Sequence, residues 1–319
     1  MRASGLIEMG SHPYEKKILV VGVNPALQKV LFLDEIEPGE VNRASKVYTT
    51  SAGKGANFAK AASLSGSSPV IYQFSGGING RLFLAELKRL KIRNITVLVK
   101  TETRCCTTCI ETGRRIVTEY IEPSGEIPPE KASELMSAIE ADIAGFDAVA
   151  ICGTYPPGLN PGFYGKISEL ASDHGIPLFV DACCDIKAVL ENGVEILKVN
   201  SKEISELSGC NSIRDAAKLV MRSYNVKAIA VTAGGGTSWL FTGDDTIKFK
   251  LPEIKVLNST GAGDTVSGVF LSEYLKSGDF SESFKKALAA GTASCLTPLP
   301  GVFSPDNAEK IYGEIRQVE

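Results

Sequence analysis

The chain has 319 residues, of which 44% are hydrophobic and 22% are charged, and its net charge at pH 7 is -3. These values are ordinary for a globular protein with a sizeable core, and they indicate neither a basic nucleic-acid surface nor an acidic tail. No apolar run approaches the roughly 20 residues of a membrane helix. We therefore expect no nucleic acid and no membrane among its partners.

The N-terminus and the cysteines indicate the compartment. Residues 1–16 carry charge at both ends and have no apolar signal core, which indicates a loose N-terminal extension. The eight cysteines form no Cys-x-x-Cys motif, and the two histidines, His12 and His174, leave few ligands for a zinc site. We expect reduced, mostly packed cysteines and a cytoplasmic protein.

Six apolar runs have the composition of strands that are buried on both faces. They are residues 17–23, 69–74, 147–152, 177–182, 195–199 and 227–232. Segments with helical spacing lie between them, at residues 55–65, 79–90, 129–141, 161–174 and 212–224. This alternation predicts a single α/β domain over 17–319, with a doubly wound, mostly parallel sheet flanked by helices.

Two segments break the alternation. Residues 28–52 contain Pro-Gly-Glu followed by an extended run, and residues 104–121 contain two β-rich runs around Thr-Gly-Arg, which is a hairpin signal. We expect them to form a small antiparallel β lid that closes over a ligand. An edge sheet without a function is the alternative.

A glycine-bearing turn precedes an apolar helical stretch near the C-terminus. Gly261, Ala262 and Gly263 place backbone N–H groups at a helix N-terminus, which favours an anion. Asp264 follows them, and an acid beside an anion site makes sense if it accepts a proton from a hydroxyl that attacks a phosphate. The alternative is an acid that caps the helix and has no further function.

Residues 51–57, Ser-Ala-Gly-Lys-Gly-Ala-Asn, open another predicted helix. They are not a Walker phosphate loop, because Tyr48 stands where that motif requires glycine and Gly55 where it requires Ser or Thr. Backbone amides, Lys54 and Asn57 suit a phosphorylated or polyhydroxylated ligand. A helix-start loop with a solvated lysine is the alternative.

Two further segments have both a functional and a structural interpretation. Asn200 and Glu203 are three residues apart at a predicted helix start, so they could hold a hydrated Mg²⁺ near a nucleotide or form a capping box. The glycine-rich turn within 230–240 either allows a ligand to approach closely or is merely tight.

The order of these motifs resembles that of the PfkB (ribokinase-like) carbohydrate kinases over roughly residues 17–315. The matching motifs are residues 52–57, 153–158, 199–203 and 261–264. Residues 24–27 and 39–43 resemble the branch of 1-phosphofructokinase and tagatose-6-phosphate kinase, which phosphorylates hexose phosphates.

The resemblance implies a doubly wound α/β domain with a β lid, and transfer of the ATP γ-phosphate to a hydroxyl of a hexose phosphate. Asp264 would be the base, the amides of residues 261–263 would form an anion hole, and Glu203 and Asn200 would lie near Mg²⁺ and hold it through water. The residues implied at the nucleotide are Lys198, Asn200, Thr232, Gly234 and Gly291. Those implied at the sugar phosphate are Asn24, Gln28, Asn42, Gly53, Lys54, Asn57 and Arg104. The lid edges could also pair to form a homodimer.

Three positions depart from the family pattern. Gln28 replaces the usual Asp, Ser51 replaces the first Gly of Gly-Gly-Lys-Gly, and the nucleotide loop at 234–237 lacks the usual second glycine. A carboxylate accepts hydrogen bonds from two hydroxyls, whereas an amide offers one acceptor and one donor group. Three functions therefore stay open: a hexose-phosphate kinase, a kinase of a free sugar or nucleoside, and a non-catalytic sugar-binding protein.

Overall fold

The computed structural model describes residues 15–182, 185–243 and 245–318. Its strands are β1 (Lys17–Val21), β2 (Ala26–Leu33), β3 (Lys46–Ala52), β4 (Ser68–Gly76), β5 (Arg93–Val99), β6 (Cys105–Glu111), β7 (Ile116–Ile121), β8 (Ala148–Cys152), β9 (Leu178–Asp181), β10 (Val194–Asn200), β11 (Val226–Thr232), β12 (Thr237–Thr242), β13 (Asp245–Lys250) and β14 (Arg316–Val318). Its helices are α1 (Lys54–Leu64), α2 (Gly77–Arg89), α3 (Pro129–Asp142), the short η1 (Ile143–Gly145), α4 (Pro161–Asp173), α5 (Lys187–Leu190), α6 (Ser201–Ser208), α7 (Ile213–Ser223), α8 (Ala262–Ser277), α9 (Phe280–Ser294) and α10 (Pro305–Glu314).

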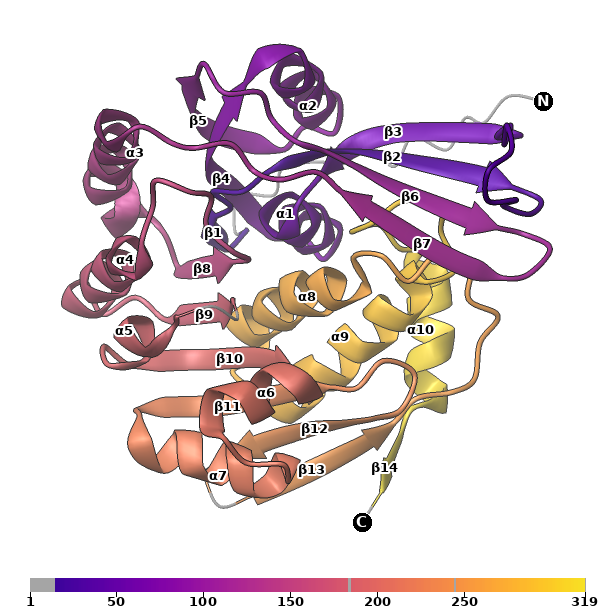
Figure 1. The fold of residues 1–319 in the computed structure, drawn as a ribbon. Coiled ribbons are helices and arrows are strands. Elements are labelled where there is room, and N and C mark those ends of the chain that lie inside the picture. The colour runs from indigo at the N-terminus through magenta and orange to yellow at the C-terminus, as the bar shows by residue number, and fades with distance from the viewer. Residues whose placement is uncertain (1–14, 183–184, 244, 319) are drawn as a thin grey trace.

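The larger sheet has the strand order β14-β13-β12-β11-β10-β9-β8-β1-β4-β5. Every pair from β11 to β5 is parallel, and the pairs from β11 to β14 are antiparallel. Helices cover both faces (Figure 1), with α1, α2 and α8 to α10 on one face and α3 to α7 on the other. The expected doubly wound, mostly parallel sheet is confirmed.

The residues just before β1 are attached to the larger sheet by an ion pair. Lys16 Nζ lies 3.0 Å from Asp147 Oδ1, so the fold already holds residue 16 of the expected loose extension. Residues 1–14 of that extension lie outside the described residues. Among the helices of the described ranges, none is long and apolar enough to cross a lipid bilayer.

The second sheet, which we call the lid, has the order β3-β2-β6-β7 and projects from the main domain (Figure 1). Its outer pairs are antiparallel as expected, but the central pair β2–β6 is parallel. The chain leaves the lid after β3, passes through α1 to β5 and re-enters in the direction of β2, which is the crossover that parallel pairing requires. The main domain supports the lid where Thr50 Oγ1 donates to Glu86 Oε1 of α2 at 3.3 Å.

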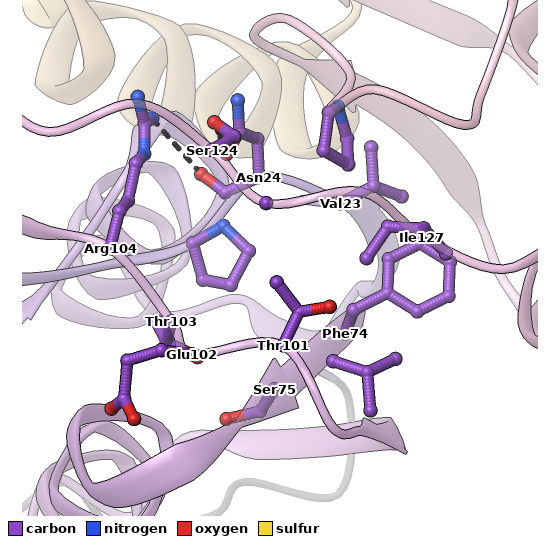
Figure 2. Close-up of a pocket in the computed structure, with 14 residues that line it drawn as sticks. Val23, Asn24, Phe74, Ser75, Thr101, Glu102, Thr103, Arg104, Ser124 and Ile127 are labelled. Carbon is purple, nitrogen blue, oxygen red and sulfur yellow. Dashed lines mark hydrogen bonds between the residues drawn. The ribbon is translucent and has the colours of Figure 1, made fainter.

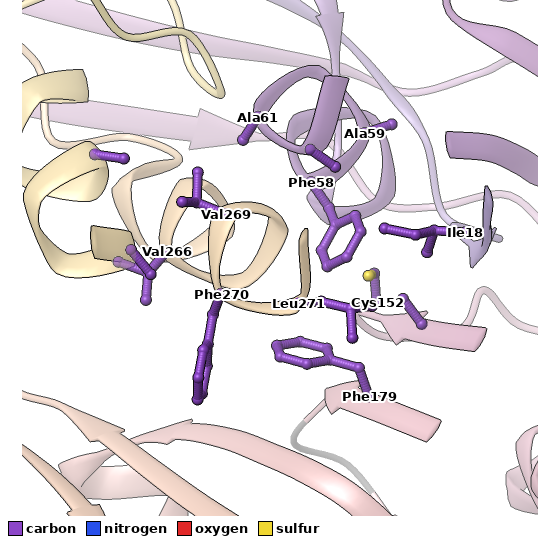
Figure 3. Close-up of a cluster of buried hydrophobic side chains, with 14 of the residues drawn as sticks. Ile18, Phe58, Ala59, Ala61, Cys152, Phe179, Val266, Val269, Phe270 and Leu271 are labelled. Carbon is purple, nitrogen blue, oxygen red and sulfur yellow. The ribbon is translucent and has the colours of Figure 1, made fainter. Parts of the chain in front are cut away.

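Helix α8 is buried at the centre of one face of the larger sheet (Figure 3). Phe270 of α8 and Phe58 of α1 both pack on Phe179 of β9, with ring centroids 6.4 and 5.7 Å apart. α1 and α8 also touch directly, because Gly268 has no side chain. A Cβ atom there would lie 2.4 Å from the carbonyl oxygen of Phe58. This contact sets how closely α1 and α8 approach each other.

We predict that Gly268→Ala separates α1 from α8 and lowers the free energy of unfolding by roughly 1–3 kcal/mol, because the methyl group meets backbone. Gly313→Ala in α10 is the matched control, since a Cβ atom there meets nothing within 4 Å. It should stabilise the protein by about 0.5–1 kcal/mol through helix propensity. Chemical denaturation measures both variants, and equal changes would contradict the close-packing explanation.

Candidate active site

The carboxyl ends of the central strands lie at one edge of the larger sheet, where doubly wound proteins bind ligands. Asp181 ends β9, Asn200 ends β10 and Thr232 ends β11. The loops after β1 and β8 open at the same edge and bring Asn24 and Thr154 together, with Asn24 Nδ2 3.2 Å from Thr154 Oγ1.

Helix α1 begins at this edge through a turn that only glycine fits well. Gly53 has φ of +91°, and a Cβ atom on it would lie 2.9 Å from the carbonyl oxygen of Asn24. The turn directs Asn57 in the first turn of α1 toward Asp264 at the start of α8, and Lys54 toward Asp181 at the end of β9. The sequence pattern at 51–57 therefore predicts the local backbone correctly as a glycine turn that opens a helix.

Asp264 lies in the first turn of α8 and is buried. It does not cap the helix, because the N-cap residue is Gly261 and no side chain caps it. Its Oδ2 accepts a hydrogen bond from Nδ2 of Asn57 at 2.8 Å. The Oδ1 of Asn57 is buried and has no hydrogen-bond partner within the described chain. Such an atom, next to a buried acid, is available to a ligand hydroxyl.

Asp181 holds the charged side chains of the site together. Its Oδ1 lies 2.7 Å from Lys54 Nζ, and its Oδ2 lies 3.3 Å from Lys198 Nζ. The hydroxyl of Ser267, one turn along α8 from Asp264, donates to the same Oδ2 at 2.6 Å. One carboxylate thus links α1, β10 and α8, and two lysines stand beside the position of Asp264.

The burial and charges of this cluster shift its pKa values in opposite directions. Burial disfavours the ionised form of Asp181, but the charges of Lys198 and Lys54 outweigh it and hold its pKa well below the usual range. Burial raises the pKa of Asp264, which the charge of Lys54 offsets only in part and the charge of Asp181 reinforces. The site therefore contains one permanently ionised carboxylate and one carboxylate that is more basic than usual.

The turn before α8 presents backbone donors to the cleft. Gly261 has φ of +77°, and a Cβ atom on it would lie 2.6 Å from Cβ of Pro300. The N–H of Ala262 donates to Ser259 O at 3.2 Å, whereas the N–H groups of Gly261 and Gly263 have no acceptor in the described chain. Two of the three predicted amides are therefore available to an anion at the helix N-terminus.

A cleft of about 630 Å³ lies between the ends of β10 and β11, residues 251–256 and helices α8 and α9. Among the residues that line it are Lys198, Asn200, Thr232, Gly234, Ala262, Gly263 and Gly291. The cleft thus brings together all five residues that the resemblance implied at the nucleotide. Its volume suits a nucleotide-sized ligand. Gly291 also allows α8 and α9 to approach, since a Cβ atom there would lie 2.4 Å from Val266 Cγ2.

Asn200 and Glu203 form the capping box that the sequence left as an alternative. Asn200 Oδ1 accepts from the N–H groups of Lys202 and Glu203, both at 2.9 Å, and Glu203 Oε2 accepts from the N–H of Asn200 at 2.8 Å. The amide oxygen is therefore already used. Glu203 Oε1 has no hydrogen-bond partner in the described chain, so this carboxylate fits a Mg²⁺ ion held through water.

Arg104, which the resemblance implied at the sugar phosphate, lies just before β6. Its Nη2 donates to the carbonyl oxygen of Asn24 at 3.3 Å, as Figure 2 shows. Its Nε is buried without a hydrogen-bond partner among the described residues. Asn24 is held from the other side by Ser124, whose hydroxyl donates to Asn24 Oδ1 at 2.8 Å. Arg104 therefore keeps donors for an anionic group.

Two residues that the resemblance implied at the sugar are bound within the lid. Asn42 accepts from the N–H of Glu37 at 2.8 Å and donates to the carbonyl oxygens of Glu37 and Glu40 at 2.9 and 3.0 Å. Its side chain therefore closes its own exposed turn. Gln28 is buried in β2, where its Nε2 donates to Thr108 Oγ1 at 2.9 Å.

The cysteines described in the structure agree with the sequence prediction. The six of them, Cys105, Cys106, Cys109, Cys152, Cys210 and Cys295, are free. The adjacent pair at 183–184 lies outside the described residues. Within the described ranges, no group of three or more His, Cys, Asp or Glu side chains could hold a metal ion.

Sequence analysis missed three residues of the site. Asp181 and Ser267 complete the charged cluster, and Ser238 of β12 lines the nucleotide cleft with a buried hydroxyl that has no partner in the described chain. A signal for Asp181 existed, because an acid at the carboxyl end of a buried parallel strand faces the ligand edge of the sheet. The two serines have no such signal.

Comparisons with known proteins agree with this geometry. The family model described as "pfkB family carbohydrate kinase" matches residues 16–307. The tagatose-6-phosphate kinase of Staphylococcus epidermidis is 26% identical over 310 residues, which cover 95% of this chain and 99% of that protein.

Solved structures share the fold. A possible 1-phosphofructokinase from Thermotoga maritima has a TM-score of 0.85 at 22% identity, covering 95% of this chain and 100% of that chain. Phosphofructokinase-2 from Escherichia coli, in complex with potassium, has a TM-score of 0.84 at 22% identity, covering 94% of this chain and 99% of that chain.

The nucleotide cleft, the buried acid beside backbone donors and the lid together define a phosphotransferase with an alcohol acceptor. The chain belongs to the pfkB family of carbohydrate kinases, as the motif order predicted. It is an ATP-dependent carbohydrate kinase.

We predict that Asp181→Asn lowers the free energy of unfolding by about 3–5 kcal/mol, because two lysine ammonium groups lose their buried partner. Because the folded-state pKa of Asp181 is lowered, its contribution is present above about pH 4 and is lost as the pH falls through the lowered pKa. Ser267→Ala is the graded control, since it removes one hydrogen bond to the carboxylate and should cost about 1.5–3 kcal/mol. Denaturation at pH 7 measures both, and a loss under 1 kcal/mol for Asp181→Asn would contradict the assigned ion cluster.

Proposed function

We propose that this enzyme transfers the γ-phosphate of ATP to a hydroxyl of a hexose phosphate, with Asp264 as the base. The hydrogen bond from Asn57 to Asp264 supports this role most directly, because it aims one oxygen of a buried, basic carboxylate at the sugar side of the cleft. The nucleotide cleft lies on the other side of the same turn.

Each step of the transfer has a candidate group. The raised pKa makes Asp264 a better proton acceptor than an exposed aspartate, so it takes the proton of the sugar hydroxyl as the hydroxyl attacks. The N–H groups of Gly261 and Gly263 stabilise the negative charge of the phosphoryl group in flight. Lys54 and Lys198 add positive charge nearby.

Mg²⁺ bound with ATP would neutralise the phosphate oxygens and hold them for in-line transfer. Glu203 would hold the ion through water by its unpartnered oxygen. The backbone of Asn200 keeps the Glu203 carboxylate in place through its N–H group.

A phosphorylated acceptor is supported by the cations on the sugar side. Lys54 points from the first turn of α1, and Arg104 keeps a buried donor without a partner in the described chain. Neutral hydroxyls do not require positively charged partners, whereas the phosphate of a hexose phosphate is bound well by lysine and arginine. The relatives named tagatose-6-phosphate kinase and possible 1-phosphofructokinase are consistent with such an acceptor.

The lid supports a second proposal, a homodimer. It exposes Val47 on β3 and Ile116, Tyr120 and Ile121 on β7, with exposed fractions of 46–63%. A tetrameric inhibited form is the subject of one structure of Escherichia coli phosphofructokinase-2. Exposed apolar side chains on sheet edges favour pairing with a second copy. The cytoplasmic location stays a prediction from the cysteines.

We predict that Asp264→Asn lowers kcat by roughly 10²–10⁴-fold, the usual contribution of a general base, and leaves ATP binding nearly unchanged. In the wild type, kcat should fall as the pH drops through the pKa of Asp264, at a higher pH than for an ordinary carboxyl group near 3.9. Steady-state rates from pH 4.5 to 8.5 measure both effects. Exposed Asp173→Asn is the control, and near-normal turnover by Asp264→Asn would refute the base assignment.

We predict that rates measured with a panel of acceptors separate a hexose-phosphate kinase from a kinase of a free sugar or nucleoside. With Mg-ATP, fructose 1-phosphate, fructose 6-phosphate or tagatose 6-phosphate should give the highest kcat/KM, because Lys54 and Arg104 bind a phosphate. Coupled ADP release measures turnover, and Arg104→Met should raise KM for the sugar phosphate more than for ATP. Preferred turnover of a free hexose or a nucleoside would favour the alternative acceptor class. No turnover with any acceptor would favour a non-catalytic protein.

A further inference from the structure

A chain of hydrogen bonds connects the buried amide of the lid to the loop that forms the anion site. Gln28 Nε2 donates to Thr108 Oγ1 at 2.9 Å. The Thr108 hydroxyl in turn donates to Glu119 Oε1 at 3.5 Å. The same Glu119 oxygen accepts from the hydroxyl of Thr260 at 3.0 Å. Thr260 immediately precedes Gly261, so the Glu119 carboxylate lies beside the anion turn.

The strand register explains how Glu119 reaches this position. Thr108 of β6 and Glu119 of β7 are directly opposite each other, so their side chains share one face of the lid. Gln28 is part of the same face, as its bond to Thr108 shows. Because Thr260 belongs to the main domain, this face of the lid is the one that faces the turn before α8.

From these contacts we infer that Glu119 is the carboxylate that binds the hydroxyls of the sugar acceptor, in place of the aspartate that is usual at position 28. This inference rests on the proposed sugar-phosphate kinase function. Its basis is that Glu119 Oε2 has no partner in the described chain, while Oε1 is fixed by Thr260 and Thr108. An oriented carboxylate with a spare oxygen is a strong acceptor for sugar hydroxyls.

The identity of residue 28 controls whether Glu119 can act in this way. The amide of Gln28 donates to Thr108, which leaves the Thr108 hydroxyl proton available for Glu119. An aspartate at position 28 has no N–H group, so it could not donate to Thr108 as Gln28 does. It would also place a second negative charge two hydrogen bonds from Glu119, and like charges at this distance oppose each other. Gln28 and Glu119 therefore act as a pair.

Steady-state kinetics of the full chain test the role of Glu119, with tagatose 6-phosphate as acceptor, or fructose 1-phosphate if it turns over faster. Glu119→Gln should raise KM for the sugar phosphate roughly 10- to 100-fold, the effect of losing hydrogen bonds to a charged group. KM for ATP should change less than twofold, and the melting temperature should stay within about 2 °C because the side chain is exposed. Glu40→Gln removes a carboxylate from the exposed β2–β3 turn and should change neither KM.

A second pair of variants tests the coupling with residue 28. Gln28→Asp alone should raise KM for the sugar phosphate, whereas Gln28→Asp combined with Glu119→Gln should recover part of the loss caused by Glu119→Gln. The inference is overturned if Glu119→Gln leaves KM for the acceptor unchanged while the wild type is active. It is also overturned if Thr260→Val, which keeps the carboxylate, reproduces the full effect. A wild type that phosphorylates no sugar phosphate would instead refute the proposed function itself.

Discussion

The ionised carboxylate of Asp181 is the interaction on which the active site depends. It lies at the end of β9 and binds Lys54 from α1, Lys198 from β10 and Ser267 from α8. Without it, the buried ammonium group of Lys198 would lack a partner and incur a desolvation penalty of several kcal/mol, and the partly exposed ammonium group of Lys54 would lose its ion pair. Its second effect is electrostatic, because its charge helps to raise the pKa of Asp264. A structural ion cluster therefore also makes the carboxylate of Asp264, the proposed base, more basic.

Close packing of α1, α8 and α9 determines how near the side chains of the site lie to one another. Gly268 allows α8 to touch the backbone of α1, and Gly291 allows α9 to touch α8. Gly268 lies one turn along α8 from Asp264, and the aromatic cluster around Phe179 holds α1 and α8 on the sheet. The 2.8 Å bond between Asn57 and Asp264 results from this packing rather than from local sequence. Gly268 and Gly291 thus affect the geometry of the site although neither bears a functional group.

The sequence predicted the elements that have strong local signals, and it missed those that depend on distant pairing. Apolar runs located β1, β4 and β8 to β11, and a glycine turn located the start of α1. The parallel pairing of β2 with β6 could not be found, because hairpin signals describe only neighbouring segments. Motif order pointed to residues that line one cleft, such as Lys198, Thr232 and Gly291, but Ser267 and Ser238 have no signal in the sequence. For the pair Asn200 and Glu203, sequence left a cap and a metal role open, and the structure contains the cap.

The lid shows why a substitution in a motif need not remove a function. From the motif alone, Gln28 replaces the usual aspartate, so one carboxylate that could bind a sugar is missing. In the fold, it is joined through Thr108 to Glu119, so the negative charge is still present on the same face, one strand beyond Thr108. Glu119 also accepts a hydrogen bond from Thr260 of the main domain, whereas Gln28 connects to Thr260 through Thr108 and Glu119. If the acceptor binds Glu119 as proposed, the contact of Glu119 with Thr260 joins the bound acceptor to the turn before α8, and a lid held in this position would exclude water from the phosphoryl group.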